Sequence, residues 1–142
     1  MTEKPILLVL VGLPRSGKTS WARGLSYPIV NPDSIRLAMH GQRYLDLLEP
    51  LVWLAAKWMV KSLFLAGHTH VVIDATNMTR KRRDAWQSPD WRAMFKRIET
   101  PANECLRRAE AAGDKDIIPV IMRMDGEYEP LEPDEIRYLA AG

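Results

Sequence analysis

The chain has 142 residues, of which 46% are hydrophobic and 27% are charged. A chain of this length and composition is expected to form one domain over residues 1–142, with a core large enough to fold without a disulfide or a structural metal. Cys105 is the only cysteine in the sequence, which excludes an internal disulfide and a cysteine-rich zinc site. The formal net charge of +2 identifies no partner by itself.

The sequence carries no pattern typical of a targeting or membrane segment. Its first residues lead directly into an apolar run, and its longest apolar stretch, residues 51–66, contains two lysines and is too short to span a bilayer. We therefore expect a cytoplasmic protein with no membrane partner. Nothing in the composition predicts an oligomeric state.

The first half of the chain predicts two strands and three helices. Residues 6–11 are apolar on both faces, as in a buried strand, and residues 19–25 can continue as a helix. A short second strand is predicted at residues 27–30. Asn31 is a good N-cap for the next helix, which is expected to begin at Pro32 or Asp33. A long helix then follows from Pro50 to Phe64; its apolar residues surround most of its circumference, so we expect it to be well covered.

The second half continues the alternation of strands and helices. Residues 70–74 predict a third buried strand, and Thr79 is expected to cap a helix that runs to Trp86. A fourth strand is predicted at residues 94–99, followed by helices at 101–112 and 119–128. Such alternation is typical of an α/β fold whose parallel sheet binds ligands beyond the carboxyl ends of its strands.

Residues 12–19 carry the pattern Gly, four residues, Gly-Lys-Thr directly after the first strand. Such a loop offers successive backbone N–H groups to phosphate oxygens, and Gly12 and Gly17 have no Cβ to prevent the chain from wrapping around a phosphate. Lys18 would reach the β- and γ-phosphates, and the Thr19 hydroxyl would bind Mg²⁺. The other loop positions expected to contact the nucleotide are Pro14, Arg15, Ser16 and Ser20. The sequence therefore predicts a P-loop that binds ATP with Mg²⁺.

Two carboxylates are predicted at the same edge of the sheet. Asp74 ends the third strand, where an acidic group can hold a Mg²⁺-bound water. Asp33 follows the second strand, across the cleft from the P-loop, where a kinase needs a carboxylate to accept the proton of the acceptor hydroxyl. Arg36 lies one helical turn later on the same face, and its planar fork suits a phosphate. The alternative is a helix-capping Asp33 beside a surface Arg36.

Three segments together resemble the P-loop kinases related to the phage-type polynucleotide 5′-kinase: residues 12–19, 31–36 and 72–78. The Thr100-Pro101 start of a helix, residues 105–108 and residues 119–130 are also similar, so the resemblance covers nearly the whole chain. It implies a three-layer P-loop kinase fold with about four parallel strands in the order 2-3-1-4 and a helical lid over residues 101–128.

The same resemblance implies roles for individual residues. Asp33 would be the general base, and Arg36 would hold a phosphate of the acceptor. Thr76 would also contact the acceptor's phosphate, whereas Asn77 could equally be a turn residue. The dense basic run from Arg80 to Arg83 has two interpretations, a solvated helix face or a patch in which Arg82 and Arg83 contact a nucleic-acid backbone.

The predicted lid departs from its relatives at one position. Many of them carry a basic residue immediately before the lid glycine, whereas this chain has Ala112 before Gly113. Arg108, one turn earlier, is our first choice for the cation that stabilises the transferring phosphoryl group, and Arg15 in the P-loop is the second. Other basic residues in the same region are Arg107, Lys115 and Arg123.

The sequence lacks the motifs of a GTPase switch and of a transporter ATPase, which favours a kinase. The expected acceptor is the 5′-hydroxyl of DNA or RNA. The alternatives are a small molecule such as a nucleoside or polyol, a hydroxymethylated base in DNA, or a nucleotide-binding module that catalyses nothing.

Overall fold

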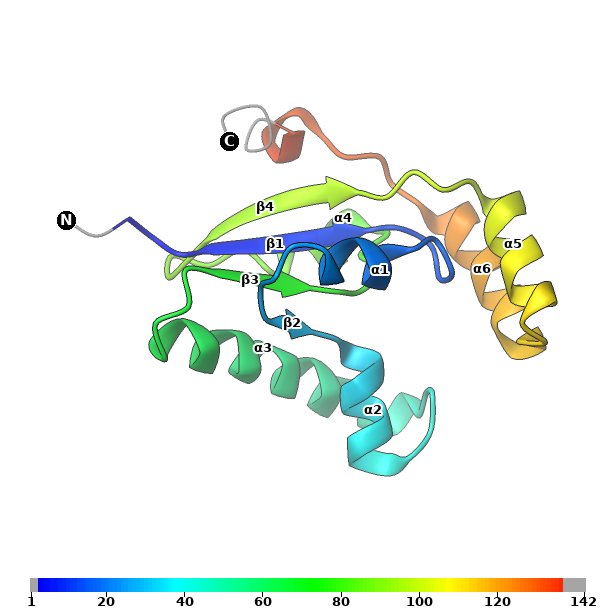
Figure 1. Cartoon of the computed structure of the whole chain (residues 1–142), viewed down its shortest axis with the longest axis horizontal. Coiled ribbons are helices and arrows are strands. Elements are labelled where there is room, and N and C mark those ends of the chain that lie inside the picture. The colour runs from blue at the N-terminus through cyan, green and yellow to red at the C-terminus, as the bar shows by residue number, and fades with distance from the viewer. Residues whose placement is uncertain (1–2, 137–142) are drawn as a thin grey trace.

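A parallel four-stranded sheet forms the centre of the computed structural model, which describes residues 3–136 (Figure 1). Residues 1, 2 and 137–142 of the expected domain lie outside the described residues. The strands are β1 (Ile6–Val11), β2 (Ile29–Val30), β3 (His70–Ile73) and β4 (Arg92–Arg97), in the order β2-β3-β1-β4. The predicted order and parallel direction are therefore confirmed.

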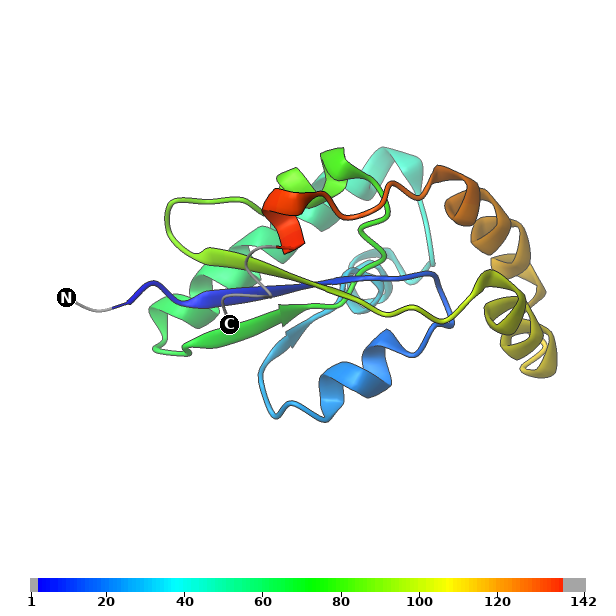
Figure 2. The ribbon, with the colours of Figure 1, turned by 90° about the horizontal axis from the view of Figure 1, so that it is seen from above.

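Helices cover both faces of this sheet. They are α1 (Lys18–Arg23), α2 (Pro32–His40), α3 (Glu49–Leu65), α4 (Arg80–Asp84), α5 (Ala102–Ala111) and α6 (Ile118–Glu127). Short 3-10 turns lie at Asp46–Leu48 and Lys115–Ile117, and residues 133–136 form a last helical turn. Seen from above in Figure 2, α1 lies on one face of the sheet and α3 and α4 on the other, while α5 and α6 extend beyond the carboxyl ends of the strands.

The alternation of β1 explains this three-layer arrangement. Leu7, Val9 and Val11 are fully buried in the core cluster that contains Val52 and Val60 of α3. Leu10 points to the opposite face, where it packs in a smaller cluster with Ala22 of α1 and Val72 of β3. Successive side chains of a strand point to opposite faces, so an apolar run without polar alternation requires helices on both.

The predicted elements agree with the observed ones, and their ends differ by no more than two residues. Strand β4, for example, begins at Arg92 rather than residue 94 because the backbone N–H of Arg92 already bonds to the carbonyl of Pro5. The 3-10 turns and the helical turn at residues 133–136 were not predicted.

The expectation that α3 is well covered is wrong. Val52, Ala56 and Val60 face the sheet and are fully buried, but the opposite side of the helix exposes Leu51, Leu54, Trp58 and Leu65. Among the described residues, nothing covers this outer side. Apolar residues all round a helix indicate burial only when a second layer is available, and α3 packs on the sheet from one side.

The interpretation of Arg80–Arg83 as one exposed basic patch is also wrong. Arg83 is fully buried: its Nε donates to Glu135 at 2.6 Å, and its Nη1 donates to the carbonyls of Asn77 and Met78. Arg80 forms ion pairs with Asp84, Glu132 and Asp134. These carboxylates lie on α4 itself and on residues 132–135, so Arg80 and Arg83 attach the last described segment to the rest of the protein.

The predicted lid helices, α5 and α6, pack directly on the P-loop. Leu13 of the loop lies in one buried cluster with Cys105 and Ala109 of α5 and Ile121 of α6. In Figure 1, α5 and α6 form an antiparallel pair beside the loop that follows β1. Within residues 3–136, none of the helices combines the length and apolar character needed to cross a membrane.

Candidate active site

The P-loop connects β1 to α1, and its two glycines are needed for different reasons. A Cβ at Gly12 would lie 2.9 Å from Ser16 Oγ and 3.2 Å from the carbonyl oxygen of Ile98, so it would force the Ser16 hydroxyl to shift and would press on the backbone of Ile98. Gly17 is the N-cap of α1 and has φ of 98°, a left-handed conformation that favours glycine. Close packing therefore favours glycine at position 12, and backbone conformation favours glycine at position 17.

Lys18 begins α1 and its side chain is almost completely buried. Its Nζ donates to the carbonyl of Leu13 at 2.7 Å and lies 3.5 Å from Ser16 Oγ. Burial lowers the pKa of Lys18, while the carboxylates of Asp74 and Asp33 act in the opposite direction. An ammonium that is held by neutral oxygens and has lost its water is a strong attractor for phosphate oxygens.

Thr19 and Asp74 meet as the sequence predicts. Thr19 Oγ1 donates to Asp74 Oδ2 at 2.6 Å, and Asn31 Nδ2 donates to the same oxygen at 3.2 Å. Sequence reasoning assigned Asn31 only the role of a helix cap, which it also fulfils by accepting from the backbone N–H of Asp33. A hydroxyl beside a carboxylate is a donor set that suits Mg²⁺. No group of three or more His, Cys, Asp or Glu that could hold a metal alone occurs in the described part of the chain, so Mg²⁺ here would depend on phosphate oxygens as well.

Asp33 and Arg36 lie on one side of α2, at its N-terminal end. Arg36 Nη1 donates to Asp33 Oδ1 at 2.7 Å, and the Asp33 side chain is 76% exposed. The other donors of the same guanidinium bind Glu49 of α3, with distances of 2.8 Å from Nε and 2.7 Å from Nη2. Glu49 is a residue that sequence reasoning missed; an acidic residue at the start of a helix carries no signal for such a contact.

These contacts shift the ionisation of both partners. Burial favours the neutral form of Glu49, but the hydrogen bonds and charge of Arg36 outweigh it and hold the pKa of Glu49 below its ordinary value. Burial also opposes the charge of Arg36, and the carboxylates of Glu49 and Asp33 nevertheless raise its pKa. Arg36 is therefore a fixed cation whose planar fork is already occupied by Glu49.

Arg108 of α5, the first choice for the predicted lid cation, lies at the P-loop. Arg108 Nη1 donates to the backbone carbonyl of Arg15 at 3.2 Å, and it lies 3.7 Å from the position that a Cβ on Gly17 would take. Arg108 Nε is held by Glu104 at 3.1 Å. Arg107 points its guanidinium at Glu104 alone and is 67% exposed. Of these two arginines, Arg108 is the one at the loop.

Thr76 and Asn77, the two acceptor contacts predicted after β3, differ in burial. Asn77 is fully buried: its amide donates to the carbonyl of Leu10, and its Oδ1 accepts from Trp86 Nε1. With φ of 47° it is a turn residue, the alternative that the sequence left open. Thr76 is half-buried, and its carbonyl accepts from the N–H of Gly12. Both residues thus hold the start of the P-loop.

The remaining predicted residues are at the surface. Arg82 is exposed, and its guanidinium stacks on the Trp53 ring at 4.2 Å from the ring centre. Ser20 is exposed on α1 and Pro14 is half-exposed at the turn of the P-loop. Thr100, which was recognised only as part of a helix start, donates from Oγ1 to the carbonyl of Ser16 at 2.7 Å.

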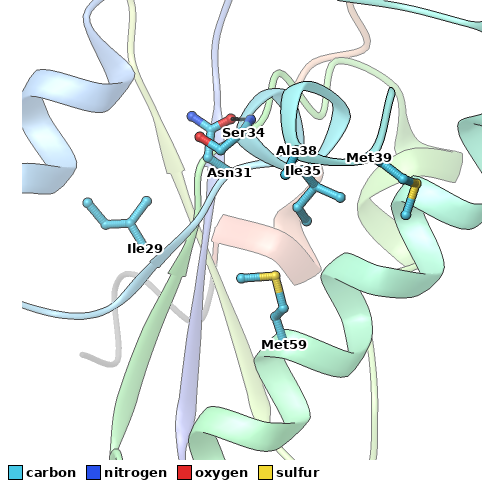
Figure 3. Close-up of a pocket in the computed structure, with 7 residues that line it drawn as sticks. All are labelled: Ile29, Asn31, Ser34, Ile35, Ala38, Met39 and Met59. Carbon is cyan, nitrogen blue, oxygen red and sulfur yellow. Dashed lines mark hydrogen bonds between the residues drawn. The ribbon is translucent and has the colours of Figure 1, made fainter. Parts of the chain in front are cut away.

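Two hollows flank the site. One of about 390 Å³ lies at the β2 edge, where Asn31 and Ser34 of the α2 start face a mostly apolar wall that includes Met39 and Met59 (Figure 3). The other, of about 640 Å³, lies beside the end of β4, between Trp21 of α1 and the segment that follows α6. The P-loop lies between them, so neither hollow contains the phosphate-binding residues.

Comparison with known proteins agrees with this geometry. A family model described as an AAA domain matches residues 7–117, which is most of the chain. The chain belongs to this AAA domain family. No curated protein sequence matches it.

Solved structures similar to this AAA domain include two that contain Pnkp1. A chain of the Pnkp1/Rnl/Hen1 complex is 29% identical, with a TM-score of 0.67, over 76% of this chain and 40% of that one. A chain of the Pnkp1/Rnl/Hen1 RNA repair complex is 23% identical, also with a TM-score of 0.67, over 91% of this chain and 48% of that one. The present chain thus spans less than half the length of either relative.

A gluconokinase from Sinorhizobium meliloti 1021 has the same fold, with a TM-score of 0.58 and 22% identity over 91% of this chain and 78% of that one. The AAA domain described here therefore has the P-loop kinase fold.

Proposed function

We propose that this protein is an ATP-dependent kinase that phosphorylates the 5′-hydroxyl of a polynucleotide. The observation that carries the proposal is the position of Asp33. Its carboxylate is exposed at the start of α2, it is oriented by Arg36 at 2.7 Å, and its charge acts on Lys18 of the P-loop. A proton acceptor thus lies at the same cleft as the group that would bind the phosphates.

The proposed reaction follows from these positions. The acceptor hydroxyl attacks the γ-phosphorus, the bond from the γ-phosphorus to the bridging oxygen breaks, and ADP leaves with that electron pair. Asp33 takes the proton of the hydroxyl, and Arg36 keeps the carboxylate in place. Lys18 neutralises the β- and γ-phosphate oxygens, and Arg108 faces the developing charge from the lid. Mg²⁺, when held by Thr19 with Asp74 beside it, supplies further positive charge at the phosphates.

A polymer end as acceptor is supported by the openness of the site. The Asp33 side chain is 76% exposed, which leaves space beside it for a large acceptor. The segments that carry the resemblance to polynucleotide 5′-kinases also include both Asp33 and Arg36. The similarity to a chain of the Pnkp1/Rnl/Hen1 complex agrees with this acceptor class.

One observation favours a second candidate, a kinase for a small hydroxyl compound such as a nucleoside or polyol. Glu49 binds two of the donors of Arg36. An acceptor phosphate would have to displace this carboxylate, whereas an acceptor without a phosphate would leave the pair intact. A hydroxymethylated base in DNA and a module that binds nucleotide without catalysis are the other outcomes of the test.

The test is a transfer assay with γ-labelled ATP and three acceptor sets: 5′-hydroxyl oligonucleotides of DNA and RNA, nucleosides with and without a 3′-phosphate, and polyols. We expect label on the oligonucleotides. Asp33→Asn retains the shape of the side chain but accepts no proton. This variant should bind ATP normally, and its rate of phosphoryl transfer should fall steeply. Lys18→Ala should lose at least about 10²-fold in transfer. Near-normal turnover in a folded Lys18→Ala variant would contradict the kinase assignment.

A comparison of two variants separates the candidate acceptors. Under the polynucleotide proposal, Arg36→Ala raises KM mainly for acceptors with a 3′-phosphate, and Glu49→Gln lowers KM for the same acceptors because it frees the fork of Arg36. Equal effects on phosphorylated and unphosphorylated acceptors would favour the small-molecule kinase.

A further inference from the structure

The carboxylate of Asp114 binds two arginines, Arg15 of the P-loop and Arg43. Asp114 accepts two hydrogen bonds from Arg43, Nη1 to Oδ1 and Nη2 to Oδ2, both at 2.6 Å, and a third from Arg15 Nη2 to Oδ2 at 2.9 Å. The Asp114 side chain is only 12% exposed. Neither Arg43 nor Asp114 was a candidate site residue on the basis of the sequence.

The three residues come from the three segments that surround the cleft. Arg15 belongs to the P-loop itself, Arg43 follows α2 on the acceptor side, and Asp114 follows α5 in the lid. In Figure 1 the α2–α3 connection and the α5–α6 turn both lie beyond the carboxyl ends of the strands. The hydrogen bond that Arg43 donates to Asp114 is the main cause of the raised pKa of Arg43; burial opposes it, and the charges of Asp114 and then Asp33 add to it. Arg43 therefore lies within electrostatic reach of the proposed general base.

Among its hydrogen-bonded groups, this cluster has one carboxylate for two guanidinium groups, and the charges of Asp33 and Asp116 also act on Arg43. Asp114 supplies one negative charge to two guanidinium groups. The hydrogen bonds from Arg43 lower the pKa of this carboxyl most; burial opposes them, and the hydrogen bond from Arg15 adds to them, so the pKa lies well below its ordinary value. A terminal phosphate carries two negative charges and three oxygens, so it satisfies two convergent arginine forks better than a carboxylate does. A phosphate can therefore replace the Asp114 carboxylate as the partner of Arg15 and Arg43.

We propose that Arg15 and Arg43 form a two-arginine site for the γ-phosphate of the bound nucleotide, and that Asp114 occupies this site until the nucleotide displaces it. The inference rests on the proposed function, because it requires a triphosphate in the P-loop. It differs from the role of Arg108, whose guanidinium lies at Gly17 and Arg15 and is not bound to Asp114. The two-arginine site contacts the γ-phosphate already in the ground state, so its loss weakens binding rather than slowing the transfer step.

The test measures equilibrium binding of Mg-AMPPNP, of Mg-ADP, and of a nucleoside 3′-phosphate in the presence of ADP. Arg43→Ala should weaken AMPPNP binding about tenfold or more and change ADP binding less than about twofold, because only the triphosphate reaches the site. Arg43→Lys should recover part of the loss, since it keeps the charge without the fork. Arg23→Ala, an exposed arginine in the last turn of α1, is the matched control and should change neither affinity.

Asp114→Asn distinguishes the proposal from a purely structural contact by the direction in which it changes the affinity for AMPPNP. It removes the competing carboxylate and should tighten AMPPNP binding several-fold, and Arg43→Ala should still weaken AMPPNP binding in the Asp114→Asn background. Three results would overturn the inference: equal losses for AMPPNP and ADP, a loss confined to the nucleoside 3′-phosphate, or weaker AMPPNP binding by Asp114→Asn. A wild-type protein that binds neither AMPPNP nor ADP would instead refute the proposed function itself.

Discussion

At the scale of single residues, three cations that we propose to contact phosphate are hydrogen-bonded to protein oxygens. Lys18 donates to the carbonyl of Leu13, Arg108 donates to that of Arg15, and Arg43 binds Asp114. Each side chain is therefore already oriented toward the P-loop or its mouth, and the entropy of ordering it is lost on folding rather than on binding.

Arg108 offers a sharp test at this scale. Removing a cation that acts mainly on the transition state lowers kcat and kcat/KM together and leaves nucleotide affinity little changed. We expect Arg108→Ala to lose about 10²-fold or more in kcat, and Arg15→Ala to lose much less. Steady-state kinetics with separately measured nucleotide affinity checks this.

Arg107→Ala is the matched control for that experiment. Arg107 is the neighbouring arginine on α5, and it binds the same carboxylate as Arg108. Hydrogen bonds from Arg107 first, and from Arg108 after the opposing effect of burial, lower the pKa of Glu104 to about 2, so this carboxylate stays ionised near neutral pH in either variant. A larger loss of kcat in Arg107→Ala than in Arg108→Ala would place the lid cation one residue earlier.

At the scale of elements, the acceptor side of the cleft depends on the contact between α2 and α3. Arg36 and Glu49 are the charged pair in this contact, and both side chains are only 13% exposed. The pair fixes the start of α2, which carries Asp33, against the long helix that packs on the sheet. The geometry of the proposed base is thus set by a contact between two helices rather than by its own helix alone.

This contact predicts a pH dependence of stability. Because the folded-state pKa of Glu49 lies below its ordinary value of 4.5, its stabilisation is complete above that value and is lost as the pH falls through the folded-state pKa. Glu49→Gln should therefore lower the free energy of unfolding by about 1–2 kcal/mol near pH 7 and by clearly less near about pH 3. Urea unfolding of both proteins at the two pH values measures the difference. A deficit that is equal at both would show that the Glu49 charge contributes nothing.

The basic helix α4 makes a second prediction at this scale. Of the two arginines expected to contact nucleic acid, only Arg82 is exposed. If α4 follows a nucleic-acid backbone, Arg82→Ala should reduce the slope of log affinity for an oligonucleotide against log salt by about one unit, without a change in ATP affinity. The measurement is a salt titration of oligonucleotide binding. An unchanged slope would identify Arg82 as part of a solvated face stacked on Trp53.

At the scale of the whole molecule, a buried ion pair joins the segment after α6 to helix α4. Glu135 is 1% exposed, and it accepts from Arg83 Nε at 2.6 Å and from the backbone N–H of Glu132 at 2.9 Å. Arg83 in turn donates to the carbonyls of Asn77 and Met78, close to the P-loop support formed by Asn77. The segment that contains Glu135 therefore supports, through Arg83, the turn that holds the start of the P-loop.

Glu135→Gln should consequently destabilise the fold strongly. It leaves the Arg83 charge buried without its partner, which typically costs about 3–5 kcal/mol. Glu132→Gln, a change at an exposed carboxylate that pairs with Arg80, should cost less than about 1 kcal/mol. Denaturant unfolding monitored by tryptophan fluorescence compares the two. Similar small losses would mean that Arg83 is adequately solvated without Glu135.

The amino-acid sequence by itself determined the elements and the P-loop, and its resemblance to polynucleotide 5′-kinases implied the sheet order. The elements and the loop depend on local chemistry: apolar runs specify buried strands, Asn31 and Thr79 specify helix starts, and Gly12, Gly17, Lys18 and Thr19 have roles tied to their spacing. Even Asp33 and Asp74 could be placed, because residues after parallel strands meet at one edge of the sheet.

Only the tertiary structure decided which charges are free to act. Arg83 and Arg82 are neighbours in the same basic run, yet one is buried against Glu135 and the other is exposed. Glu49 and Asp114 carry no motif, and each captures an arginine from a segment distant in the sequence. Pairing of this kind depends on three-dimensional proximity between long side chains, which no local periodicity encodes. For the same reason, the exposed face of α3 could not be distinguished from its buried face until the layers around it were known.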